Sequence, residues 1–190
     1  MGRDNRTIDP LLPYHAGSRG SNRGLIAWDH HDYASIVGEI ARAARRHRWA
    51  VYAWCVLPNH YHLVLRMPRG GFSVGFQQIN GNHSRRTNRR YGRCAHLFEN
   101  RPWSVELTSD VHVAAAVAYA LRNPIAANLC KRAEDWPYSS YRATVGLEEA
   151  PTWLALDEVL PVFGSDKAEA INALSNLVHW SPALVSDTNY

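Results

Sequence analysis

The chain has 190 residues, of which 46% are hydrophobic and 20% are charged. This composition is typical of a folded globular protein and excludes a disordered chain. No apolar run reaches the length of about 20 residues that a membrane-spanning helix needs. The segment Met1–Arg6 leads into no apolar core of the kind a secretory signal requires. Cys55, Cys94 and Cys130 form no Cys-x-x-Cys pair, so we expect reduced thiols in the cytoplasm.

The first part of the chain predicts a strand, a helix and two further strands. Pro13–Arg19 is a short strand, and Asp29–Arg48 is a helix with apolar residues at intervals of three and four. Trp49–Leu57 is rich in aromatic and β-branched residues and predicts the second strand. A turn then leads into the third strand, His60–Arg66. This order already suggests a mixed α and β protein.

Two more elements complete a recognisable order. Ser73 is expected to cap a helix that runs to about Tyr91, and Trp103–Leu107 predicts the fourth strand. The resulting β-α-β-β-α-β order is that of a ferredoxin-like α+β fold, an antiparallel sheet with helices on one face. In this fold the first and third strands are central.

Helices are expected to follow this core. Thr108–Asp110 should cap a third helix, Val111 to about Arg122, which ends before Pro124 because the residue before a proline disfavours the helical conformation. A new helical turn is expected from Ile125 onward. Two small amphipathic helices, 153–163 and 167–180, would form a C-terminal appendage. We therefore expect a main domain of residues 1–146 and a helical appendage of residues 147–190.

His60 and His62 are separated by one residue, so on a strand both side chains lie on the same side. Two neutral imidazoles side by side suit the binding of one divalent cation. Alternatively, each histidine is an ordinary half-buried strand residue, because so short a motif often occurs by chance. Tyr61 falls on the opposite side of the strand and is not a candidate nucleophile.

Arginines gather in the predicted second helix and form a sector of roughly 140° around its axis. Such a face is either solvated or binds phosphate, for which arginine offers bidentate contacts. The five residues are Arg85, Arg86, Arg89, Arg90 and Arg93. Near the first strand, Tyr14, His15 and Arg19 are candidates for holding unstacked bases of a nucleic acid.

Tyr119 and Asn123 lie four residues apart, on one face of the predicted third helix. Taken alone, Tyr119 fits a tyrosine packed at the edge of the core with a hydrogen-bonded hydroxyl. Asn123 equally fits an N-cap for the turn that begins at Pro124. Position alone does not choose between these roles and a functional one.

Five sequence blocks in this order resemble the IS200-like tyrosine transposases, specifically their REP-associated branch. They are Leu-Pro-Asn-His-Tyr-His-Leu (57–63), the arginine-rich run 88–93, His-Leu-Phe (96–98), Tyr-Ala-Leu-Arg-Asn-Pro (119–124) and Trp-Pro-Tyr-Ser-Ser-Tyr (136–141). The resemblance extends from about residue 14 to residue 146, which is most of the chain. The histidine block and the tyrosine block together make it specific.

The resemblance implies a single-stranded DNA endonuclease and strand transferase of the HUH class that acts on hairpin DNA. It implies that His60, His62 and Asn123 hold Mg²⁺ or Mn²⁺, and that Tyr119 is the nucleophile. The expected products are a 5′-phosphotyrosine and a free 3′-hydroxyl. Such an enzyme would work in the cytoplasm, at the nucleoid. Whether Tyr119 acts within its own chain or across a homodimer stays open.

Two other functions remain compatible with these residues. A ferredoxin-like sheet with basic helices is also what RNA-recognition domains present, so the chain could be a non-catalytic nucleic-acid-binding module. It could also be a metal-dependent hydrolase unrelated to DNA, in which water attacks and Tyr119 is structural. A covalent protein–DNA product would separate the first function from both alternatives.

Overall fold

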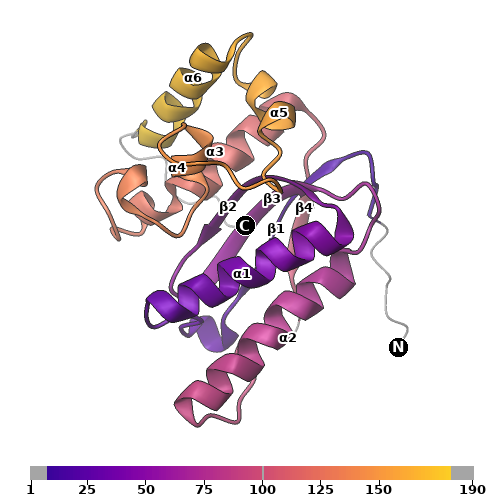
Figure 1. The fold of residues 1–190 in the computed structure, drawn as a ribbon, viewed down its shortest axis with the longest axis vertical. Coiled ribbons are helices and arrows are strands. Elements are labelled where there is room, and N and C mark those ends of the chain that lie inside the picture. The colour runs from indigo at the N-terminus through magenta and orange to yellow at the C-terminus, as the bar shows by residue number, and fades with distance from the viewer. Residues whose placement is uncertain (1–7, 100, 181–190) are drawn as a thin grey trace.

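The computed structural model describes residues 8–99 and 101–180 and shows an α+β fold (Figure 1). Six elements form its core in the predicted β-α-β-β-α-β order. They are β1 (Pro13–Arg19), α1 (His30–His47), β2 (Ala50–Val56), β3 (His60–Arg66), α2 (Phe72–Tyr91) and β4 (Trp103–Glu106). The bounds of β1 and β3 are those expected from the sequence. The predicted fold class is confirmed.

The sheet is antiparallel with strand order β2-β3-β1-β4, so β1 and β3 are central, as predicted. In the β1–β3 pairing His15 lies opposite Val64, and Arg19 lies opposite His60. Because side chains alternate along a strand, His15 and Arg19 lie on the same face of the sheet as the histidine pair of β3.

Helices α1 and α2 lie side by side over the other face (Figure 1). Tyr61, Leu63 and Leu65 of β3 are fully buried there, in one core cluster with Ile36 of α1 and Phe76 of α2. At about 25 cal/mol per Å² of apolar surface, this burial is the main stabilising contribution of the helical layer.

The start of α2 differs from the prediction. Its N-cap is Gly71, with φ of 86°, and Ser73 lies inside the first turn without a capping role. A Cβ at position 71 would lie 2.8 Å from His47 Nδ1, so the positive φ and the close neighbour both favour glycine here. By contrast, α1 is capped as expected, because Asp29 Oδ1 accepts a hydrogen bond from the backbone N–H of Asp32.

Helix α3 (Asp110–Ala126) packs against β2 and β3 on the face opposite α1 and α2. The Ser109 side chain caps it by accepting a hydrogen bond from the His112 N–H. The expected break before Pro124 is wrong, since α3 continues through this residue to Ala126. A proline so close to the helix end removes only one backbone hydrogen bond, and Pro124 itself is buried.

The remaining helices gather beside α3. The predicted helix 153–163 is shorter, consisting of α5 (Leu156–Val159) and the 3₁₀ turn Leu160–Val162. The predicted helix 167–180 is α6 (Lys167–His179), which packs on α3 in the second core cluster. The division into domains at residue 146 stays a prediction. The other short elements are 3₁₀ turns at Ser21–Arg23 and Ala133–Asp135 and the helix α4 (Tyr141–Thr144).

Among residues 8–99 and 101–180, no helix is both long enough and apolar enough to span a membrane.

Candidate functional site

The two histidines of β3 lie side by side on the α3 face of the sheet. The His60 and His62 rings have centroids 4.8 Å apart and meet edge to face. His62 is 4% exposed, and its Nε2 is a buried nitrogen without a hydrogen-bond partner. Such an atom is costly to leave unpaired, so it is available to a ligand, although the buried Trp54 Nε1 also lacks a partner. Tyr61 is fully buried on the opposite face, as expected.

The other ring nitrogen of each histidine is held by a neighbour. Asn59 Oδ1 lies 2.7 Å from His60 Nδ1, and His15 Nε2 lies 3.0 Å from His62 Nδ1. When each Nδ1 donates its hydrogen bond, the Nε2 lone pairs of both rings are free to bind a cation. Outer partners of this kind orient the histidine ligands of metal sites.

Burial also sets the charge state of these rings. Desolvation lowers the pKa of His60 and of His15 to about 4, and the positive charge of Arg19 adds a smaller lowering at His60. Desolvation likewise holds the pKa of His62 well below its ordinary value. All three imidazoles are therefore neutral at neutral pH, which is the form that binds metals.

Tyr119 of α3 faces this cluster from across the sheet surface. The centroid of its ring lies 5.6 Å from that of His62 and 5.7 Å from that of His15. The side chain is 51% exposed. The alternative that Tyr119 is a tyrosine packed at the core edge stays open, since its ring contacts His15 and His62 there. A phenol here can reach a substrate bound over the histidines.

The residues present fit a divalent cation, because two neutral imidazoles offer free lone pairs and one of those atoms is buried without a partner. Within the described part of the chain, no three His, Cys, Asp or Glu side chains gather closely enough to hold an ion. A third protein ligand would therefore be of another kind. Asn123 lies one turn from Tyr119, its Nδ2 donates to the Tyr119 carbonyl at 2.8 Å, and its role as a ligand stays a prediction.

The sequence pattern of the IS200-like transposases matches residues 14–119, which is more than half of the chain and includes both histidines and the tyrosine. The chain belongs to the IS200-like transposase family. The resemblance seen in the sequence blocks is thereby confirmed.

Two curated relatives carry the name REP-associated tyrosine transposase. The Haemophilus influenzae protein is 26% identical over 110 residues, which cover 52% of this chain and 62% of that protein. The Escherichia coli protein is 24% identical over 115 residues, covering 60% of this chain and 67% of that protein. The chain thus spans about three fifths of the length of the Haemophilus relative.

A solved structure shares the fold of this chain. It is a REP-associated tyrosine transposase bound to a REP hairpin, with a TM-score of 0.63 and 21% identity. The match covers 80% of this chain and 89% of that one. The arrangement of sheet and helices is therefore that of the family.

The three residues predicted to hold bases near the first strand have different environments. Tyr14 is 5% exposed and its hydroxyl accepts a hydrogen bond from the Asp9 N–H, and its contact with bases stays a prediction. His15 is packed against His62, which makes a supporting role at the histidine pair the better interpretation. Arg19 lies on the histidine face, opposite His60, where it can contact a phosphate.

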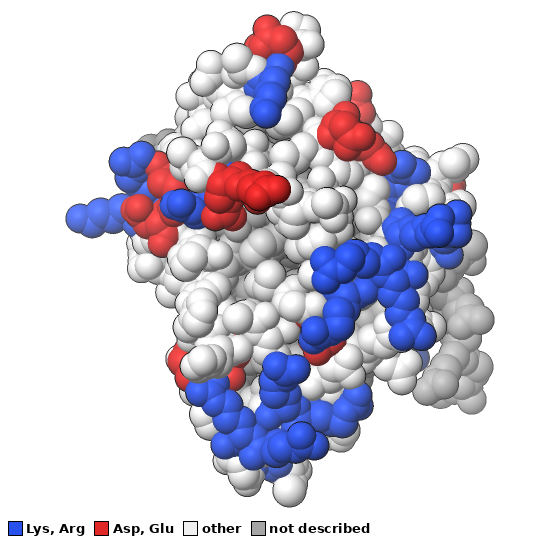
Figure 2. All heavy atoms as spheres, in the orientation of Figure 1, with Lys and Arg blue, Asp and Glu red and all other residues white. Residues whose placement is uncertain are grey.

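Four of the five arginines lie on α2, Arg93 follows its C-cap Gly92, and all five are exposed. Figure 2 shows basic side chains gathered over α1 and α2. Arg90 differs from the others because its guanidinium binds the carboxylates of Asp29 and Asp32, and this pairing raises its pKa. Arg93 lies 5.1 Å above the Trp28 ring. The family resemblance offers no test of whether these arginines bind DNA, so that role stays a prediction.

Sequence reasoning missed two neighbours of the site. Asn59 orients His60, and the Trp103 ring lies 4.7 Å from His15 and 5.5 Å from His62 between centroids. Asn59 could have been found from its place directly before His60. Trp103 depends on the β1–β4 pairing, in which it lies opposite Gly17.

Proposed function

We propose that this transposase is a metal-dependent single-stranded DNA endonuclease and strand transferase that acts beside a hairpin through Tyr119. One observation carries the proposal: an exposed phenol faces a buried imidazole whose Nε2 has no partner. The names of the two curated relatives support a hairpin of the REP kind as the substrate.

The residues of the site divide the work as follows. His60 and His62 would hold Mg²⁺ or Mn²⁺ through Nε2, with Asn123 Oδ1 as a third ligand. When bound, the cation supplies charge neutralisation at a non-bridging phosphate oxygen. Arg19, on the same face, adds a fixed positive charge that suits the flanking phosphate.

In the cleavage step the Tyr119 oxygen forms a bond to phosphorus, and the bond from phosphorus to the 3′-oxygen breaks. The phenol proton is lost and the departing oxygen gains one, so the products are a 5′-phosphotyrosine and a free 3′-hydroxyl. In the joining step another 3′-hydroxyl displaces Tyr119 and the phenol regains its proton. One phosphodiester is exchanged for another, so no ATP is needed, and the sequence has no Walker-type glycine loop.

The test is to incubate the protein with labelled single-stranded hairpin DNA and Mn²⁺ and to look for a complex that survives denaturation. We expect the complex with the native chain and with Arg142→Ala, whose side chain pairs with Glu148 away from the site. Tyr119→Phe should bind the hairpin but form no such complex. An adduct that persists in Tyr119→Phe would disprove the proposal. Binding without any adduct would favour the non-catalytic module.

A further inference from the structure

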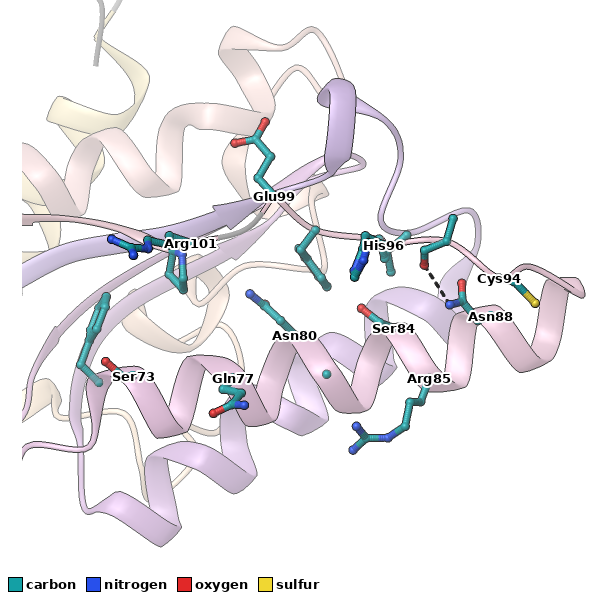
Figure 3. Close-up of a pocket in the computed structure, with 16 residues that line it drawn as sticks. Ser73, Gln77, Asn80, Ser84, Arg85, Asn88, Cys94, His96, Glu99 and Arg101 are labelled. Atoms are coloured by element: carbon teal, nitrogen blue, oxygen red, sulfur yellow. Dashed lines mark hydrogen bonds between the residues drawn. The ribbon is translucent and has the colours of Figure 1, made fainter. Parts of the chain in front are cut away.

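His83 is a buried polar residue of α2 to which the proposed function gives no role. The next residue, Ser84, lines the groove between α2 and residues 94–99 (Figure 3). His83 is instead fully buried, and its ring contacts Ser35 of α1 and the backbone of Ile26. A buried polar side chain costs free energy unless it is hydrogen-bonded, so the partners of this ring show what it holds in place.

The direction of these hydrogen bonds follows from the chemistry of the partners. Burial lowers the pKa of His83, so its ring is neutral at neutral pH and carries one N–H. The Ile26 carbonyl only accepts, so His83 Nε2 donates to it at 2.7 Å, and Nδ1 accepts from the Ser35 hydroxyl at 3.1 Å. Thr87 Oγ1 lies farther from Nε2, at 3.3 Å. The shortest contact of the ring therefore holds the backbone of the segment between β1 and α1.

The same segment binds the turn that leads into β3. Ile26 N–H and Ala27 N–H both donate to the Pro58 carbonyl, at 2.7 and 3.2 Å. Pro58 and Asn59 come directly before His60, the first residue of β3. Ile26 thus accepts a hydrogen bond from His83 on one side and donates one to this turn on the other.

The segment also determines which nitrogen of His60 carries the proton. Asn59 Nδ2 donates to the Arg23 carbonyl at 3.3 Å, and this contact orients the amide so that Oδ1 faces His60 Nδ1 at 2.7 Å. Because an amide oxygen only accepts, His60 Nδ1 carries the proton, and the Nε2 lone pair is left for a cation. A rotated amide would present its NH₂ group to the ring and favour the opposite tautomer.

The Arg23 carbonyl belongs to a strained turn. Asn22 and Arg23 have φ of 55° and 57°, in the left-handed region that residues other than glycine rarely adopt. Such a backbone conformation persists only where the surrounding structure fixes it. Ile26, held by His83 and by Pro58, is the anchor that follows this turn along the chain.

We propose that His83 is a positioning residue for the histidine site. Through Ile26 it holds the segment and the turn that fix the tautomer and the orientation of His60. The inference rests on the proposed function, since it assumes that His60 Nε2 binds the cation. His83 belongs to a helix of the opposite layer and touches neither cation nor substrate, so its effect passes through backbone hydrogen bonds.

Two substitutions separate the contacts of this ring. The amide of His83→Gln reaches as far as Nε2 and can still donate to the Ile26 carbonyl. The shorter His83→Asn reaches only as far as Nδ1, so it keeps a contact with Ser35 and loses the one with Ile26.

Ser35→Ala is the matched control, because it removes the other hydrogen bond of the ring and leaves the Ile26 contact in place. All three variants should have a lower melting temperature than the native chain. His83→Met, which fills the core and also lacks the donor, replaces His83→Asn where that variant does not fold.

The first measurement is a long-range proton–nitrogen correlation spectrum of the imidazoles by NMR, without metal or DNA. The native chain, Ser35→Ala and His83→Gln should show His60 with its proton on Nδ1, and His83→Asn should show a mixture of tautomers. The second measurement is the Kd for Mn²⁺ without DNA. It should rise about tenfold in His83→Asn, as when an outer partner of a ligand is lost, and stay within about twofold in His83→Gln and Ser35→Ala.

A folded His83→Asn protein that keeps the native tautomer of His60 or the native affinity for Mn²⁺ overturns the inference. An equally large loss of affinity in Ser35→Ala also overturns it, because the loss would then follow stability and not the Ile26 contact. The adduct assay with hairpin DNA tests the proposed function separately. If the native chain binds no Mn²⁺ and forms no adduct, the proposed function fails, and the tautomer of His60 in His83→Asn alone decides the role of His83.

Discussion

The two faces of the central sheet carry side chains of the same strands, but the hydrogen bonding of neighbouring polar side chains on the two faces differs. On the face under α1 and α2, the buried hydroxyl of Tyr61 donates to Asn80 Oδ1 at 2.8 Å, and Asn80 Nδ2 donates to Ser18 Oγ at 2.8 Å. One residue along β3, His62 has a buried nitrogen without a partner. Adjacent residues of one strand therefore differ: Tyr61 has its hydrogen bond and His62 Nε2 has none, as is also the case for the buried Trp54 Nε1 in the core on the helical face.

Within β3, Tyr61 therefore contributes to the stability of the core, and its neighbour His62 is a candidate for the chemistry of the site. A buried polar atom without a partner destabilises the fold by about 1–3 kcal/mol. Such an atom is expected where a ligand completes the site, and strain of this kind clusters at functional positions. We therefore expect substitutions on the helical face to change stability and substitutions on the histidine face to change chemistry.

The largest effect is expected for His62→Leu, a change that keeps the volume but removes the lone pair. Because a catalytic metal contributes several kcal/mol to the transition state, adduct formation should fall by about a thousandfold or more. The free energy of unfolding should change little, since the unpaired His62 nitrogen is gone but His15 Nε2 loses its partner. Adduct assays and chemical denaturation measure the two quantities. A strongly destabilised but active variant would contradict the contrast between the faces.

The next effect concerns Leu63, which follows His62 and is fully buried on the helical face. Leu63→Ala should lower the free energy of unfolding by about 2–5 kcal/mol, because it leaves a cavity in a packed core. Adduct formation per folded molecule should stay close to the native rate. Leu63→Met, which conserves volume, should cost less than about 1.5 kcal/mol and serves as the control. Urea denaturation with a parallel adduct assay decides this.

Much of this difference between the two faces could be predicted from the sequence, because the alternation of side chains along a strand is a local property. The alternation along His60–Arg66 placed the two histidines together and Tyr61 opposite them, and the bounds of the strand agree with the structure. The position of Tyr119 near the pair followed from the family resemblance. No local rule connects a helix residue to a strand more than 50 residues earlier.

Other features could not be predicted, since they depend on register and packing. His15 meets His62 only because β1 and β3 pair with His15 opposite Val64. That register is not visible in a single sequence, so the contact of His15 with His62 could not be foreseen. The sequence predicts that α3 ends before Pro124, because the residue before a proline disfavours the helical conformation. The packing that holds the helix through Pro124 is not local, so it could not be predicted.

A smaller effect is expected for His15, whose Nε2 meets His62 Nδ1. His15→Ala should weaken Mn²⁺ binding by about 10–100-fold, the usual loss when an outer partner of a ligand is removed. His15→Gln keeps a polar group there and should restore part of the affinity. The Kd for Mn²⁺ is measured without DNA by electron paramagnetic resonance. Native affinity in a folded His15→Ala protein would show that this contact is only structural.

The smallest effect is a difference in how stability depends on pH. The folded pKa of His15 is lowered to about 4 by burial, below the ordinary value near 6.5 of the unfolded chain. Between these values the unfolded chain binds more protons, so stability falls as pH drops from about 6.5 to about 4. One such histidine contributes at most about 1.4 kcal/mol for each pH unit in this window.

His15→Gln removes one of these groups and should make the stability curve less steep by up to that amount. His83 on the helical face also has a pKa lowered by burial, and it remains in both proteins. His60 and His62 also remain in both proteins, so the difference between the two curves isolates the contribution of His15. Urea denaturation at several pH values from 4 to 7 measures it. Parallel curves would mean that His15 titrates in the folded protein much as it does in the unfolded chain.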